Sequence, residues 1–293
     1  MKRLLAITAQ ATLCLALTTT AQAAPVTAEG NFIRLGVSDS GALIDHTTST
    51  GIQFDPTGSG NFSGAIDYLT PGFPFAFYSL GVNGEFRTAG GLEPQNNPFG
   101  ATTINLAPAG ASPVIVTSGG MFGGLGFTQA LSFDVSSRSI QARITFTNMG
   151  DAALENVVYA VGFDPDQDAD LPGSEAFDTD NRVNGQGAAA SVTAIGPVLG
   201  LGITLANSSG WTNTFAGNRL SRVTNPYLLA TEGIDDGFGD TELTLGYNLG
   251  DFAPFEQKTI GYDYTLFATV PEPGILPLTV AGLLLLGVAR RRA

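Results

Sequence analysis

Cysteine and histidine are almost absent from this chain. Of its 293 residues, Cys14 is the single cysteine and His46 the single histidine. These absences exclude a disulfide framework, a thiolate metal site and a zinc site built from two or three imidazoles. A serine triad would have to use His46, and no serine stands in the G-x-S-x-G pattern that many such enzymes share.

Basic residues are also scarce. Between residues 24 and 270, eight lysines and arginines stand against 25 acidic residues, which gives this part of the chain a net charge of −17. Phosphate groups are bound mainly by lysine and arginine, so we expect no nucleic-acid partner. Cations or neutral polymers suit such an acidic surface better.

Helical patterns are missing between residues 24 and 269. The 38 glycines, nearly twice the usual share of roughly 7%, disfavour helices there. Apolar and polar residues alternate instead, as in "RSIQARITFTN", where Ile140, Ala142, Ile144 and Phe146 share one face. We therefore predict an all-β fold, an antiparallel β-sandwich, as one domain over residues 24–269.

Nine strands are expected from this alternation. They cover residues 31–37, 75–82, 113–117, 126–134, 138–148, 156–163, 198–206, 241–247 and 258–267. The glycine-rich stretch "SGGMFGGLGF", residues 118–127, is interpreted as a bulged or tightly packed strand pair.

The N-terminus has the pattern of an export signal. Lys2 and Arg3 precede an apolar run from Leu4 to Leu17, and Ala21-Gln22-Ala23 offers the small residues that signal peptidase recognises. We predict a signal peptide over residues 1–23, with cleavage after Ala23. Its removal would also remove Cys14.

The C-terminus holds a second apolar segment. Residues 274–289 carry no charge and would form a helix of roughly 24 Å, a short transmembrane span, with the arginines behind it on the cytoplasmic side. A Pro-Glu-Pro triplet, this span and an arginine cluster, in that order at residues 270–293, resemble the PEP-CTERM sorting signal of exosortase substrates. The residues of this motif are Val270, Pro271, Glu272, Pro273, Arg290, Arg291 and Arg292.

The resemblance implies a destination. It implies a Gram-negative bacterium that makes exopolysaccharide, in which the chain is tethered transiently to the inner membrane. An exosortase then cuts near Val270 to Pro273, and the protein reaches the cell surface or the extracellular matrix. The alternative is a permanent membrane anchor. Residues 146–168 and 251–267 are similar, more loosely, to the β-rich ectodomains of other PEP-CTERM proteins.

One acidic stretch has the spacing of a calcium loop. In "FDPDQDADLPGSE", Asp164, Asp166, Asp168, Asp170 and Glu175 occupy positions 1, 3, 5, 7 and 12. Ala169 replaces the usual glycine at position 6, so the stretch is at best a calcium loop between strands, and otherwise a solvated acidic turn. A second acidic turn, "IDDGFGD", residues 234–240, contains Asp235, Asp236 and Asp240 and is interpreted as surface, with calcium binding as the alternative.

A ligand-binding role has one further candidate residue. Trp211 lies among small polar residues in "SSGWTNTF", where an indole can stack on a sugar ring or cover the edge of a sheet. We expect a structural or interaction role within extracellular polysaccharide or biofilm, without enzymatic activity. The alternatives are a carbohydrate-binding adhesin and a glycoside-acting enzyme with two facing carboxylates.

Overall fold

The computed structural model of the chain describes residues 24–91, 97–100, 105–106, 111–169, 171 and 177–269. The expected signal peptide and the sorting segment from Val270 onward lie outside these residues. Within the described ranges, no helix combines the length and the apolar character that crossing a membrane requires.

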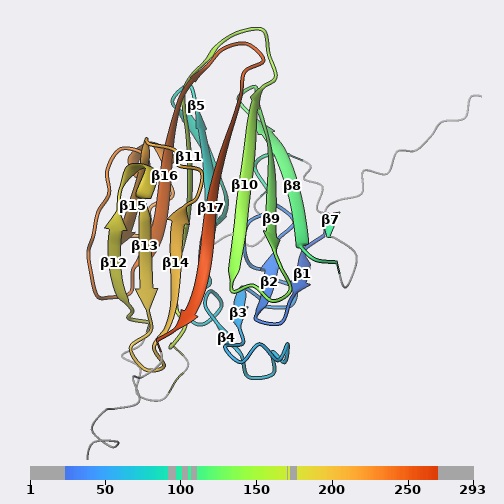
Figure 1. Cartoon of the computed structure of the whole chain (residues 1–293). Coiled ribbons are helices and arrows are strands. Elements are labelled where there is room, and N and C mark those ends of the chain that lie inside the picture. The colour runs from blue at the N-terminus through green and yellow to red at the C-terminus, as the bar shows by residue number, and fades with distance from the viewer. Residues whose placement is uncertain are drawn as a thin grey trace, which may run out of the picture.

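The described chain is built from three antiparallel sheets, and this confirms the all-β prediction. An eight-stranded sheet has the strand order β12-β13-β14-β17-β10-β9-β8-β7, and its strands lie side by side in that order in Figure 1. A five-stranded sheet has the order β15-β16-β11-β5-β6, and a small sheet has the order β1-β2-β3-β4.

The strands of the eight-stranded sheet are β7 (Asn105–Leu106), β8 (Val114–Phe122), β9 (Leu125–Phe133), β10 (Ser139–Asn148), β12 (Asp180–Gly185), β13 (Ser191–Ile195), β14 (Leu201–Asn207) and β17 (Gln257–Ala268). Those of the five-stranded sheet are β5 (Ala76–Val82), β6 (Glu85–Gly91), β11 (Leu154–Phe163), β15 (Thr214–Arg219) and β16 (Glu242–Phe252). The small sheet holds β1 (Val26–Glu29), β2 (Ile33–Val37), β3 (Ile52–Phe54) and β4 (Ile66–Asp67).

Tyrosines fill the core between the two large sheets. Tyr159 on β11, Tyr247 on β16, and Tyr262 and Tyr264 on β17 are all at most 2% exposed. The Tyr159 and Tyr262 hydroxyls lie 3.2 Å apart, which gives two buried polar groups a partner in the core. The predicted inward faces of β10 and β17 are confirmed by the burial of their alternate residues.

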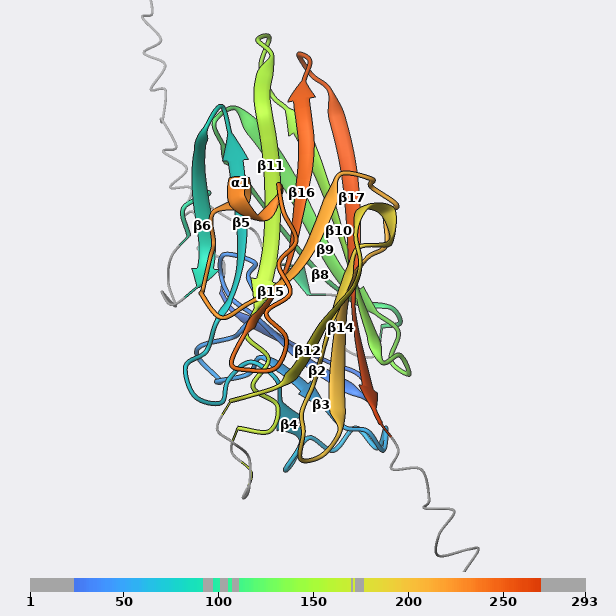
Figure 2. The ribbon, with the colours of Figure 1, turned by 90° about the vertical axis from the view of Figure 1, so that its left-hand side faces the viewer.

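β11 departs from simple alternation, because seven consecutive residues from Val157 to Phe163 are buried. The outer face of the five-stranded sheet is covered by the short helix α1 (Pro226–Leu229), as Figure 2 shows. Leu229 packs there against Phe75, Phe77 and Ala160. The only other helical element of the described residues is the 3-10 turn η1 (Gly187–Ala189).

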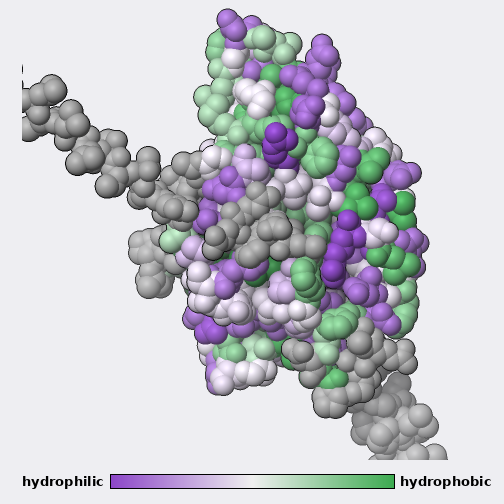
Figure 3. All heavy atoms as spheres, turned by 180° about the vertical axis from the view of Figure 1, so that it is seen from behind, coloured by the Kyte–Doolittle hydropathy of each residue, from purple (hydrophilic) through white to green (hydrophobic). Residues whose placement is uncertain are grey.

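The glycine-rich stretch forms a tight hairpin, as predicted. Phe122 at the end of β8 pairs with Leu125 at the start of β9, so Gly123 and Gly124 alone make the turn. Both have positive φ, at 56° and 85°, which is the backbone of a two-residue hairpin turn that glycine adopts without strain. Seen from behind, polar and apolar side chains are interspersed over the visible face of the molecule (Figure 3).

Candidate metal centre

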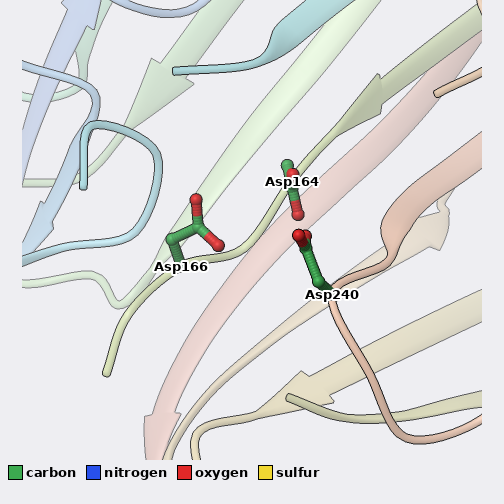
Figure 4. A group of neighbouring side chains, drawn as sticks. All are labelled: Asp164, Asp166 and Asp240. Carbon is green, nitrogen blue, oxygen red and sulfur yellow. The ribbon is translucent and has the colours of Figure 1, made fainter. Parts of the chain in front are cut away.

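Three aspartates gather at one end of the two large sheets. Asp164 and Asp166 follow β11, and Asp240 precedes β16. One carboxylate oxygen from each lies within 4.8 Å of those of the other two. Figure 4 shows the carboxylates of Asp164 and Asp240 pointing toward each other, with Asp166 beside them. Asp164 and Asp166 are buried, whereas Asp240 is exposed.

Strand pairing brings the two segments together. β11 and β16 are antiparallel neighbours with Phe163 opposite Leu243, so the residues after β11 lie beside those before β16. The backbone N–H of Asp164 donates to the Phe75 carbonyl at 3.0 Å, and that of Asp166 donates to the Tyr68 carbonyl at 2.9 Å. These hydrogen bonds fix the backbone of the segment after β11, which carries the two buried carboxylates.

Asp240 is held by the residue before it. Gly239 and Thr179 exchange two backbone hydrogen bonds of 3.1 Å. The buried Asn181 amide, at the start of β12, also donates to the Gly239 carbonyl at 3.1 Å. The loop that carries Asp240 is therefore pinned to the eight-stranded sheet.

Asp164 has one paired and one unpaired oxygen. Its Oδ2 accepts a hydrogen bond of 2.7 Å from the Arg222 guanidinium, which also lies over the rings of Phe73 and Phe75. Its Oδ1 is buried and has no hydrogen-bond partner. Burial raises the pKa of Asp164 to about 6; Arg222 opposes this shift and the nearby Asp240 adds to it.

A further buried carboxyl, that of Glu242, interacts electrostatically with Asp164. Glu242, the first residue of β16, accepts a 2.8 Å hydrogen bond from the Val223 N–H through Oε1, while its Oε2 is buried without a partner. Burial raises the pKa of Glu242 to about 8, with Arg219 opposing the shift and Asp164 adding to it. The region thus concentrates more negative charge than its two arginines balance.

The arrangement can hold a divalent cation. Two oxygens that each lie about 2.4 Å from a calcium ion are at most about 4.8 Å apart, and the three aspartates meet this limit. Three carboxylates are half or fewer of the six to eight oxygen ligands that calcium takes. The exposed side of Asp240 leaves room for water to supply others.

The predicted calcium loop is only partly reproduced. Asp164 and Asp166 belong to the cluster, but the Oδ2 of Asp168 accepts from the N–H groups of Val198 and Leu199, at 2.6 and 3.3 Å. Asp168 therefore holds the turn between β13 and β14. Asp170 and Glu175 lie outside the described residues.

The sequence placed Asp240 in a surface turn, and Asp240 is indeed exposed, but the structure also brings its carboxylate to those of Asp164 and Asp166. The other two aspartates of that turn are engaged elsewhere. Asp235 accepts from the Asn218 amide at 2.6 Å, and Asp236 from the Leu220 N–H at 2.9 Å. Only the pairing of β11 with β16 brings Asp240 to Asp164, and that pairing spans about 80 residues of sequence.

The other two candidate residues lie apart from the cluster. Trp211 is half-buried in the loop between β14 and β15, where its indole N–H donates to the Asn248 carbonyl at 2.9 Å and its ring packs against the core. His46 lies half-buried in the turn after Asp45. The pKa of His46 is lowered by burial, against the pull of Asp45 and Asp39.

No family model and no curated protein matches this chain. A solved structure has a similar fold. A bacterial glucoamylase complexed with acarbose aligns over 89% of this chain and 35% of its own, with 11% identity and a TM-score of 0.52. A polysaccharide lyase (12% identity, 84% of this chain and 34% of its own, TM-score 0.43) and an α-galactosidase from Geobacillus stearothermophilus (13%, 83% and 40%, 0.41) align less well.

The chain spans about a third of the length of the first two of these proteins. At such low identity the likeness shows the fold alone. The expectation that the chain has no enzymatic activity is contradicted by this comparison, because the same fold occurs within an enzyme, the glucoamylase. That expectation is therefore withdrawn.

Proposed function

We propose that this chain is an exported bacterial surface protein that engages extracellular polysaccharide and is stabilised by calcium. The observation that carries the proposal is the cluster of Asp164, Asp166 and Asp240, in which a buried Asp164 oxygen has no hydrogen-bond partner. A bound cation would provide that oxygen with a partner and offset the repulsion between the carboxylates. The fold shared with the glucoamylase supports carbohydrate as the class of partner.

Export and sorting belong to the same proposal. Signal peptidase would remove residues 1–23, and an exosortase would process the motif beginning at Val270, after transient tethering to the inner membrane. The large excess of acidic residues supports a calcium-containing extracellular setting.

The first test is thermal unfolding of the purified protein in excess calcium and in chelator. Calcium at a hundred times its dissociation constant should add about 2.7 kcal/mol to the free energy of unfolding, which raises the midpoint by roughly 5–10 °C. Asp164→Ala should lose this rise. Asp151→Ala, which removes an exposed charge in the turn between β10 and β11, should keep it.

Two results would count against the calcium centre. One is a midpoint that calcium leaves unchanged in the unsubstituted protein. The other is an equal calcium response in the Asp164 and Asp151 variants, which would place the ion elsewhere.

A glycoside-acting enzyme is the second candidate. Glycosidases commonly pair a carboxylic acid whose pKa is raised with an ionised carboxylate. Glu242, with a pKa of about 8, and the neighbouring Asp164 form such a pair of carboxyls. Because Glu242 and Asp164 are both buried, a substrate would meet the exposed Asp240 first.

The assay for this second candidate is the release of reducing sugar from bacterial exopolysaccharide by the purified protein. Glu242→Gln should abolish the release while Asp151→Ala leaves it intact. Release that persists at full rate in Glu242→Gln would exclude this carboxyl as the acid.

A further inference from the structure

The outer face of the eight-stranded sheet is hollowed over β8, β9, β10 and β17. Two hollows of about 580 and 630 Å³ lie there, on the side of the sheet away from the tyrosine core. Ala130 and Arg143 line both of them, so the hollows adjoin. We call this pair of hollows, centred on Arg143, the sheet groove.

The strand register explains why the sheet is hollow at this point. Arg143 on β10 stands directly opposite Ala130 on β9 and Gly261 on β17. Its neighbours across the sheet are thus a single methyl group and a hydrogen atom. The long arginine side chain therefore rises from a floor of small residues, with space on both sides of it.

The lining of the sheet groove mixes polar groups with apolar surface, and slightly more than half of it is apolar. Its polar part consists of hydroxyl and amide groups, and the charged lining residues are Arg143 and Asp263. The polar residues that contribute are Thr117, Thr128, Ser132, Gln141, Thr145 and Thr259. Such groups match the hydroxyls of a sugar chain in both donors and acceptors.

Arg143 is unlike the other basic residues. All eight basic residues between 24 and 269 fall in the described part of the chain, and seven of them have a hydrogen bond, an ion pair or a ring contact. Arg143 has none with any described residue. In a chain with so few cations, a guanidinium at the centre of a groove is left with all five of its N–H donors available.

We infer that the sheet groove binds an acidic glycan, with the carboxylate of a uronic acid unit held by Arg143. This inference rests on the proposed polysaccharide role and names its site and its class of ligand. A guanidinium and a carboxylate form a planar two-bond pair, and the hydroxyl lining receives the sugar units on either side. Acidic residues farther from Arg143 than the screening distance of about 8 Å at physiological salt repel a bound glycan only weakly, so the acidic charge near the site is that of Asp263, which lines one hollow.

The test is isothermal calorimetry of the purified protein with a galacturonate hexamer and, for comparison, a neutral cellohexaose. Arg143→Gln should weaken galacturonate binding by about ten- to a hundredfold, the usual worth of a charge-assisted contact. Arg182→Gln is the matched control, because Arg182 on β12 is an exposed arginine of the same sheet outside the groove. It should leave the affinity unchanged.

The remaining outcomes distinguish a failure of the sheet groove as the binding site from a failure of the proposed polysaccharide role. Galacturonate binding that survives in Arg143→Gln would overturn the groove as the site while leaving the polysaccharide role in place. Equal losses of affinity in Arg143→Gln and Arg182→Gln would show general electrostatic attraction and would also overturn the groove as the site. Binding of cellohexaose as tight as that of the galacturonate hexamer would overturn the preference for an acidic glycan. If neither hexamer nor the exopolysaccharide binds the unsubstituted protein, the polysaccharide role fails with the groove.

Discussion

Single carboxylates organise much of the chain between strands. Asp55, which follows β3, accepts four hydrogen bonds: from the N–H and hydroxyl of Thr57 at 2.9 and 2.6 Å, and from those of Ser59 at 2.9 and 2.7 Å. These bonds hold the pKa of Asp55 well below its ordinary value, and the bond from the Thr57 hydroxyl lowers it most, followed by that from the Ser59 hydroxyl. The contribution to stability is present above the unfolded pKa near 3.8 and is lost as the pH falls below it.

Asp55→Ala removes all four of these bonds. We expect it to lower the free energy of unfolding by about 2–3 kcal/mol at pH 7, because bonds to a charged acceptor are the stronger kind. Asp55→Asn keeps one carbonyl oxygen and should lose less. Chemical denaturation measures both, and an alanine variant within about 0.5 kcal/mol of the unsubstituted protein would contradict this account.

At the candidate metal centre, the sequence could predict individual residues but not the assembled group. Asp164 and Asp166 stand out because carboxylates in alternate positions repel one another without a cation. Asp168 shares that spacing, yet the turn at Val198 supplies its hydrogen bonds instead. Such long-range choices depend on which strands pair, and local spacing does not encode them.

At the scale of elements, long alternating strands were predicted well and short polar ones were not. β10, β11 and β17 each have a long inward face of large apolar residues, which period-two alternation makes visible. β12 (DNRVNG) and β15 (TFAGNR) have one large apolar residue each, Val183 and Phe215, and are otherwise polar or small, so they show no alternation and form strands by pairing with β13 and β16. The expected strand 198–206 begins instead at Leu201, after a turn in which Gly200 has a φ of 65°.

The packing of α1 on β16 depends on one glycine. A methyl group on Gly246 would collide with the backbone carbonyl of Leu229. We expect Gly246→Ala to push α1 off the sheet and lower the free energy of unfolding by about 2–3 kcal/mol. Gly150→Ala, in the turn after β10, meets only ordinary contacts and should stay within about 0.5 kcal/mol. Equal stability of the two variants would show that α1 is not clamped at this point.

The whole molecule combines an acidic surface with buried carboxyls that keep their protons. In the absence of metal, folded Asp164 and Glu242 release protons near pH 6 and 8, whereas the unfolded chain releases them near 3.8 and 4.5. Between about pH 4 and 8 the folded state thus binds more protons at these groups. Their effect is to lower the free energy of unfolding as the pH rises.

In chelator, the melting midpoint should therefore fall between pH 5 and pH 8 by several degrees, and saturating calcium should reduce this fall by replacing the protons. His46 acts in the opposite direction as the pH rises toward its unfolded pKa of 6.5, because its folded pKa is lowered by burial. Glu242→Gln isolates the carboxyl contribution, since its midpoint in chelator should depend less on pH. If the midpoint of Glu242→Gln in chelator falls with pH as steeply as that of the unsubstituted protein, Glu242 is not the source of the pH dependence.

The last described strand also has a mechanical consequence. β17 is hydrogen-bonded along its length to β10 on one side and β14 on the other, and Thr269 beyond it donates twice to the Gly200 carbonyl, at 2.7 and 2.8 Å. A pull applied along β17 from Thr269 would load both ladders in shear, so that many bonds share the force before any breaks. A domain held by this end would resist drag from the surrounding polymer much better than one whose terminal strand lay at a sheet edge and could be peeled away bond by bond.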